Sequence, residues 1–99
     1  MTTLTVVLEE GFDGDDVAIR VADEVVFSDS SVTTRPQIGV AERFTLDVPS
    51  GKVVLFVDVA SLGVAADVPV DVRDGTHVGI SIAGDQVVHR TASEPFRYA

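Results

Sequence analysis

The densest group of chemically reactive side chains is an acidic segment near the N-terminus. Residues Glu9 to Asp16 carry five carboxylates around Gly11 and Gly14. Calcium takes about six to eight oxygen ligands, and an acidic loop bent by glycine can supply several of them. The segment lacks the length and the terminal glutamate of an EF-hand loop, so we take Asp13, Asp15 and Asp16 as the candidate ligands. The alternative is a solvated turn that uses aspartate and glycine for their backbone conformations.

The two histidines, His77 and His89, are weaker candidates for metal binding. The rings could approach each other if their strands are neighbours in a hairpin, but a zinc site needs about three or four ligands. Alternation places His77 opposite in phase to Val78, so we expect it on an exposed face. No serine lies in a glycine-flanked nucleophile turn, and no phosphate-binding glycine loop precedes a helix. We therefore expect a protein that is not an enzyme and that holds no cofactor other than calcium at the acidic segment.

Alternating apolar residues, mostly valine, indicate that these side chains are carried by short strands. The pattern predicts eight strands, within residues 3–9, 17–21, 25–27, 44–48, 53–60, 64–72, 78–82 and 87–90, with residues 32–34 as a candidate for one more brief strand. Residues 35–42 are ambiguous between a helical turn and a loop, and Gly39 favours the loop. Pro49 to Lys52 predicts a tight hairpin turn. Pro69 cannot donate to a sheet ladder, so its strand is expected at a sheet edge, unless the proline marks a bulge.

The predicted fold class is therefore all-β. We expect one domain over residues 1–99, a small two-sheet antiparallel β-sandwich of about seven to eight strands, Ig-like or prealbumin-like, with no long helix. A small barrel is the alternative.

Charge limits the partners that such a domain can have. The chain of 99 residues has a formal net charge of −9 and a single lysine, Lys52. A surface this negative repels phosphate backbones and anionic lipid, so we expect no nucleic-acid or membrane partner. The N-terminus, which begins Met1-Thr2-Thr3-Leu4, has no basic stretch followed by a long apolar one, so no signal peptide is visible. A cytoplasmic location is therefore expected, although a processed domain would look the same.

The order of turns resembles that of small PEGA-type repeats and of carboxypeptidase-regulatory-like, or prealbumin-like, sandwiches. The residues concerned are the acidic turn at Ala22-Asp23-Glu24, the turn at Val48-Pro49-Ser50-Gly51, Gly63, and the turn at Asp74-Gly75. The glycine usual after the acidic turn residue is replaced by Glu24. The resemblance implies a non-catalytic accessory or binding domain, and it transfers no functional residue.

Apolar residues in the outward register suggest how such a domain would work. The run Val53 to Val57 is apolar in both phases, so Val54 and Phe56 fall opposite the core, as do Val7, Val26 and Val88. A second subunit or the chain's own segment 28–42 could cover them. Phe96 and Tyr98 are further contact candidates, either for a partner or for the chain's own sandwich.

The leading interpretation is thus an interaction or accessory domain that acts through a protein partner or as a homo-oligomer. The alternative is a calcium-assisted module that binds a small ligand or a carbohydrate through the acidic segment. The absence of tryptophan, with Tyr98 as the single tyrosine, disfavours a sugar-binding platform.

Overall fold

The structure, a computed structural model, describes residues 1–96 and is built from strands. Over these residues there are eight strands and one short 3-10 helix. They are β1 (Thr2–Leu8), β2 (Asp15–Val21), β3 (Glu24–Val32), β4 (Glu42–Val48), β5 (Gly51–Val59), η1 (Ala60–Leu62), β6 (Val64–Val72), β7 (His77–Ala83) and β8 (Gln86–Ala92). The all-β prediction is confirmed. No helix within residues 1–96 is long and apolar enough to cross a membrane.

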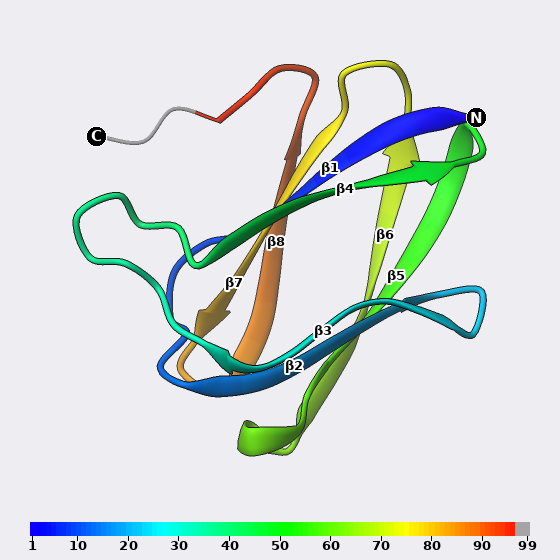
Figure 1. Cartoon of the computed structure of the whole chain (residues 1–99). Helices are drawn as coiled ribbons and strands as arrows, with labels where there is room; N and C mark the ends of the chain where they lie inside the picture. The colour runs from blue at the N-terminus through cyan, green and yellow to red at the C-terminus, as the bar shows by residue number, and fades with distance from the viewer. Residues whose placement is uncertain (97–99) are drawn as a thin grey trace.

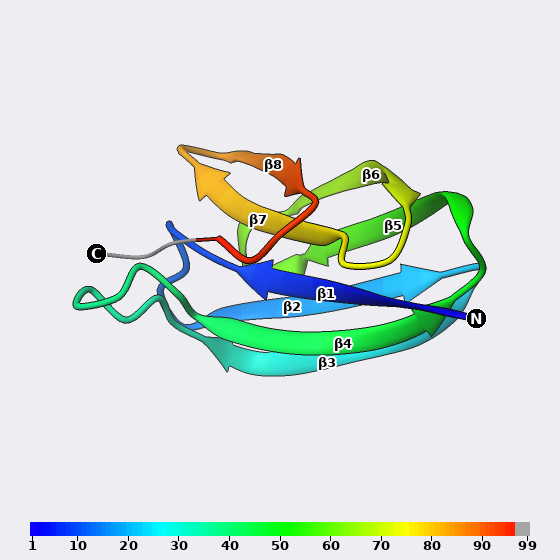
Figure 2. The ribbon, with the colours of Figure 1, turned by 90° about the horizontal axis from the view of Figure 1, so that it is seen from above.

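The strands form two four-stranded sheets that face each other (Figures 1 and 2). The first sheet has the order β4-β1-β7-β8, and the second has the order β3-β2-β5-β6. This confirms the predicted two-sheet β-sandwich. One pair departs from the expected antiparallel arrangement, because β1 and β7 run parallel. A parallel pair requires a long crossover, and here the chain between the two strands builds β4 and the whole second sheet.

The core lies between the two sheets because successive side chains of a strand point to opposite faces. Every second residue is buried for this reason in β5 from Val53 and in β6 from Val68, whereas β1, an inner strand, is buried on both faces over most of its length. Along one side of the sandwich β4 lies across from β3 (Figure 2). The rings of Phe27 and Phe44 stack there with their centroids 4.7 Å apart. The largest fully buried side chains are Leu4, Leu8, Ile19, Leu55 and Ile80.

Strand β3 is longer than its sequence suggests. The polar residues 28–31, expected between two strands, continue β3 to Val32 because their backbone pairs with β2. The register shifts between Ile19 and Arg20, so that Val26 and Phe27 both pack against the core. This β-bulge makes the prediction of an outward Val26 wrong, because the extra residue breaks the alternation.

The predicted hairpin at Pro49 to Lys52 is also wrong. Strand β4 ends in the first sheet and β5 begins in the second, so the turn is a crossover between sheets. The turn is as short as that of a hairpin, but β4 pairs with β1 while β5 lies between β2 and β6. The predicted loop at residues 35–42 is confirmed as a turn closed by a bridge between Arg35 and Val40.

The central position of Leu55 gives a test of the core register. Leu55 is fully buried on β5, so Leu55→Ala should lower the free energy of unfolding by about 2–5 kcal/mol. Lys52→Ala on the exposed face of the same strand is the control and should change it by less than about 0.5 kcal/mol. Urea unfolding of both variants measures the difference. A loss below about 0.5 kcal/mol for Leu55→Ala would mean that Leu55 does not face the core.

Candidate functional site

The acidic segment forms the crossover from β1 to β2, and its aspartates do not converge. Asp15 is buried: one carboxylate oxygen accepts a hydrogen bond from the Asp13 amide at 2.9 Å, and the other accepts one from the Ser61 hydroxyl at 2.8 Å. Asp13 and Asp16 are exposed. Among residues 1–96, no three acidic or histidine side chains are grouped so that they could hold a metal ion. Asp15 thus fastens the crossover to η1.

This arrangement predicts the response to calcium. With Asp15 turned inward, Asp13 and Asp16 supply too few oxygens, so the melting temperature should be the same in calcium, in magnesium and in chelator. Differential scanning calorimetry in the three buffers is the measurement. A ligand present at about 100 times its Kd stabilises the folded protein by about 2.7 kcal/mol. A rise of several degrees in the melting temperature with calcium alone would therefore show that the predicted calcium site exists.

The outer face of the first sheet carries an ion pair that the sequence did not predict, between a buried carboxylate and a partly exposed arginine. Glu9 follows β1, and its side chain is 6% exposed. Both of its carboxylate oxygens accept hydrogen bonds from Arg90 on β8, at 3.1 Å from Nε and 2.7 Å from Nη2. Bidentate pairing of this kind fixes the orientation of both groups.

Gly79 is the residue that makes room for this pair. It lies on β7, opposite Val7 on one side and Arg90 on the other. A Cβ atom placed on Gly79 would overlap the Glu9 carboxylate. A glycine inside a strand often marks such a close approach, and it is the sequence signal that could have located the site.

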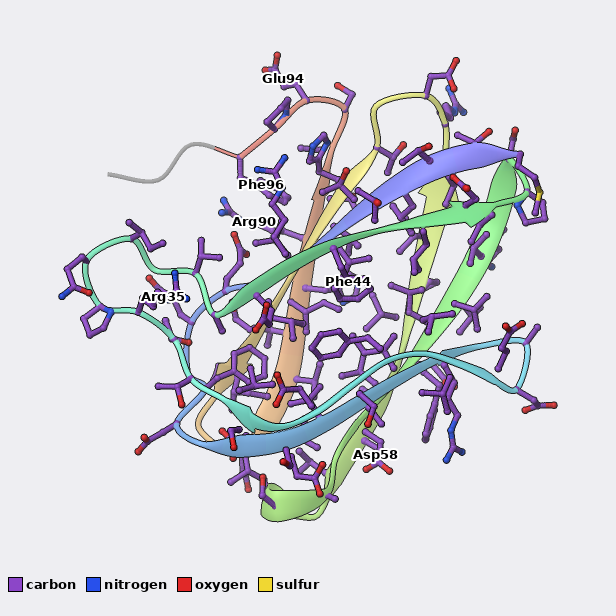
Figure 3. The ribbon with its side chains drawn as sticks, viewed as in Figure 1. Arg35, Phe44, Asp58, Arg90, Glu94 and Phe96 are labelled. Carbon is purple, nitrogen blue, oxygen red and sulfur yellow. The ribbon has the colours of Figure 1, made fainter. Side chains whose placement is uncertain are left out.

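Arg90 and Phe96 cover part of the same face (Figure 3). The guanidinium carbon of Arg90 lies 4.2 Å from the centre of the Phe96 ring. That ring meets His77 edge-on, with centroids 6.2 Å apart. Phe96 therefore packs on its own sandwich, the second of the two roles considered for it. Tyr98 lies outside the described residues.

His77 faces outward, as alternation predicts, but the expectation that it is exposed is wrong. It is 8% exposed, and its Nδ1–H donates to the Gly75 carbonyl at 2.7 Å. The histidines are not cross-strand partners either, because His77 pairs with Ala92 and His89 with Ile80. Burial under the C-terminal segment, which strand alternation does not register, explains the error.

A groove opens beside the ion pair, between the turn at 36–39 and strands β7 and β8. Its volume is about 540 Å³. Thr34 fixes the position of the turn, since its hydroxyl donates to the Glu9 carbonyl at 2.6 Å and accepts from the Phe12 amide at 3.1 Å. The rims of the groove are apolar, with Ile38 on the turn and Val88 on β8 both exposed. The other lining residues are Glu9, Glu10, Pro36, Gln37, Gly39, Gly79, Ser81, His89 and Arg90.

The outer face of the second sheet is where the structure places Val54 and Phe56. Val54 is 44% exposed, and Phe56 is partly buried. Segment 28–42, which could have covered them, instead continues β3 and then forms the turn beside the groove. Two other residues were expected to face outward. Val88 is exposed, whereas Val7, which shares the outer face of the first sheet with Glu9, is buried. Val54 and Phe56 therefore remain on an open face.

Comparison with known proteins adds no identification. No family model, no curated protein and no solved structure matches the chain.

The contact between Gly79 and Glu9 can be tested by a double-mutant cycle. Gly79→Ala should lower the free energy of unfolding by about 1–3 kcal/mol, because the new methyl group displaces the buried carboxylate. In a Glu9→Ala background the same change should cost much less. Urea unfolding of the four proteins gives the coupling energy. Additive losses would show that the carboxylate does not occupy the space above Gly79.

Proposed function

We propose that the chain is a non-enzymatic interaction domain that associates with a second copy of itself through the outer face of the second sheet. The observation that carries the proposal is the exposure of Val54 in the middle of β5, an inner strand of that sheet. Inner strands that are apolar on both faces are usually covered on both. Val25, 52% exposed at the edge of the same face, extends the apolar surface.

The charges around Phe56 support a second copy as the partner. In the register of the sheet, Arg20 on β2 lies beside Phe56 and Asp67 on β6 lies on its other side. Directly paired residues of a sheet share a face, so a cation and an anion flank the aromatic ring. The row is neutral, although the chain as a whole is strongly acidic.

Two-fold symmetry makes this row complementary to itself. A two-fold axis parallel to β5 and passing over Phe56 sets the rings of two copies against each other. It also sets Arg20 of each copy against Asp67 of the other, which gives two equivalent ion pairs. An isologous contact needs such a self-complementary surface.

The resemblance to carboxypeptidase-regulatory-like and prealbumin-like sandwiches gives further support for binding rather than catalysis. What favours the resemblance is the division into two four-stranded sheets. Over residues 1–96 the connections between strands contain one short 3-10 helix and no longer helix.

Sedimentation velocity tests the interface. The wild-type protein should contain dimer at tens of micromolar, and Phe56→Asp should be monomeric because it places an unpaired charge in the contact. Thr45→Asp is the control: it adds the same charge to an exposed position of the first sheet and should leave the dimer intact. A monomeric wild-type protein would end the proposal.

A charge exchange tests the symmetry without touching the aromatic contact. Arg20→Asp and Asp67→Arg should each weaken the dimer at least about tenfold, because each sets like charges opposite one another. The double variant has the net charge of the wild type and should recover most of the affinity. If the double variant stays as weak as either single variant, the two residues do not meet across a two-fold axis.

A further inference from the structure

Three of the four sheet edges carry features that block the addition of another strand. Strand β6 is an edge, as Pro69 predicts, and Asp67 and Asp71 flank the proline. Strand β3 has a bulge, and β4 carries charges at Glu42, Arg43 and Asp47. Proline, bulges and charges on an edge are the usual protection against pairing with another chain.

Strand β8 is protected least, because its only arginine, Arg90, is paired with Glu9 on the outer face of the same sheet. It contains no proline and no carboxylate, and all seven of its residues pair with β7 in one unbroken register. Its hairpin closes through the two-residue loop Gly84-Asp85, with Ala83 paired to Gln86. In such a hairpin the closing pair and every second pair after it exchange backbone hydrogen bonds.

The open side of β8 follows from this pattern. Val88 and Arg90 direct their N–H and C=O groups toward β7, and Val87, His89 and Thr91 direct theirs to the open edge. Over residues 1–96, β8 pairs with no strand other than β7; the beginning of β6 lies near Gln86 and Val87 without pairing with them, and the edge from Val88 onward is open. This edge therefore presents a row of backbone donors and acceptors without the protection that the other edges have.

We propose that β8 binds an extended, cationic segment of a partner protein as a fifth strand of the first sheet. Backbone hydrogen bonds to Val87, His89 and Thr91 hold the segment, and its alternate side chains lie on the outer face, next to Val88 and the groove. This surface lies on the other sheet from Val54 and Phe56, so the inference does not rest on the proposed dimer.

The charge of the groove decides which segment fits. Arg90 is occupied by Glu9, whereas exposed Glu10 takes part in no ion pair between described residues. A long basic side chain on the added strand can extend over Val88, which is 40% exposed, toward Glu10. With a net charge of −9, the domain attracts a cationic segment and repels a second copy that approaches by this edge.

Binding of synthetic peptides tests the proposal. The probe is a blocked, fluorescently labelled peptide of alternating lysine and valine with the seven-residue length of β8. We expect saturable binding by fluorescence anisotropy at low salt. The peptide with glutamate in place of lysine, and the lysine peptide N-methylated along one edge, should each bind at least about tenfold more weakly. Equal binding of either control, or no binding of the lysine peptide up to about 1 mM, would overturn the proposal.

Protein variants separate the backbone contact from the side chains. His89→Pro removes a donor at the open edge and should abolish binding, whereas His89→Ala keeps the donor and should bind as the wild type does. His89→Pro can also disturb β8, so Val88→Lys is the second test: it leaves the backbone intact and should repel the lysine peptide at least about tenfold. Unchanged affinity in Val88→Lys would place the peptide elsewhere.

Amide hydrogen exchange locates the added strand. The amides of Val87, His89 and Thr91 should exchange fast in the free protein and slowly in the complex, while those of Val88 and Arg90 are slow in both. The Phe56→Asp variant should give the same result, which separates this surface from the proposed dimer. The contrary result is that all five amides exchange slowly without peptide and that their protection increases with protein concentration. This would mean that a second copy occupies the edge, and it would refute the peptide proposal.

Discussion

Strand alternation is the constraint on which the rest of this structure depends. Each strand can send only every second side chain into the core, so a sandwich of this size has room for one apolar layer and leaves two outer faces to be filled otherwise. Leu55, Leu4 and Ile80 occupy the inner layer. The outer faces have different solutions. The first sheet covers part of its outer face with the chain's own Arg90 and Phe96, and the second leaves Val54 and Phe56 in the open.

The ion pair of Glu9 and Arg90 holds the cover over the outer face of the first sheet in place. A carboxylate that is 6% exposed is costly to bury alone, and a bidentate partner offsets the loss of water. Gly79 provides the space, and the hydroxyl of Thr34 fastens the backbone of Glu9 to the turn that forms the far wall of the groove. The ion pair, the groove and the cover over His77 are thus parts of one arrangement on the outer face of the first sheet.

Much of the fold could be predicted from sequence, because the core positions repeat with a period of two over most strands. The failures occur where a residue interrupts that period or where a distant segment acts on it. The bulge at Val26 and Phe27 cannot be read from alternation, since the extra residue is apolar like its neighbours. The crossover after Val48 looks locally like a hairpin. The sheet to which each strand belongs is decided by its distant neighbours, because β4 pairs with β1 whereas β5 pairs with β2 and β6.

The turn at Ala22 and Asp23 illustrates a further limit. Both residues have a positive φ, of 50° and 66°, which a two-residue hairpin loop of type I′ requires. Glycine and asparagine adopt this conformation readily, and alanine does so rarely. The sequence predicts a short turn here, but it does not reveal that the turn is strained.

The candidate sites were harder to predict than the fold, because they depend on contacts distant in sequence. By its residue type and its acidic neighbours Asp15 could be a calcium ligand. Its carboxylate instead accepts hydrogen bonds from the backbone of its own loop and from the Ser61 hydroxyl. Glu9 belongs to the same acidic run and has a different role, set by a guanidinium 81 residues away. The sequence supplied the residue types for a site, and the topology determined which of them meet.

Net charge and edge protection together limit where such a domain can make contacts. An acidic surface repels copies of itself, so association is favoured only where carboxylates are balanced or absent. The row through Arg20, Phe56 and Asp67 is balanced, and β8 contains no carboxylate. Elsewhere the aspartates of β6 and the charges of β4 oppose contact at their edges. The two surfaces proposed for partners, one on each sheet, are therefore places where this repulsion is weak, and the two differ in the partner proposed for each. A neutral row that is complementary to itself about a two-fold axis would suit a copy of the chain, and a strand edge beside Glu10 would suit an extended cationic segment.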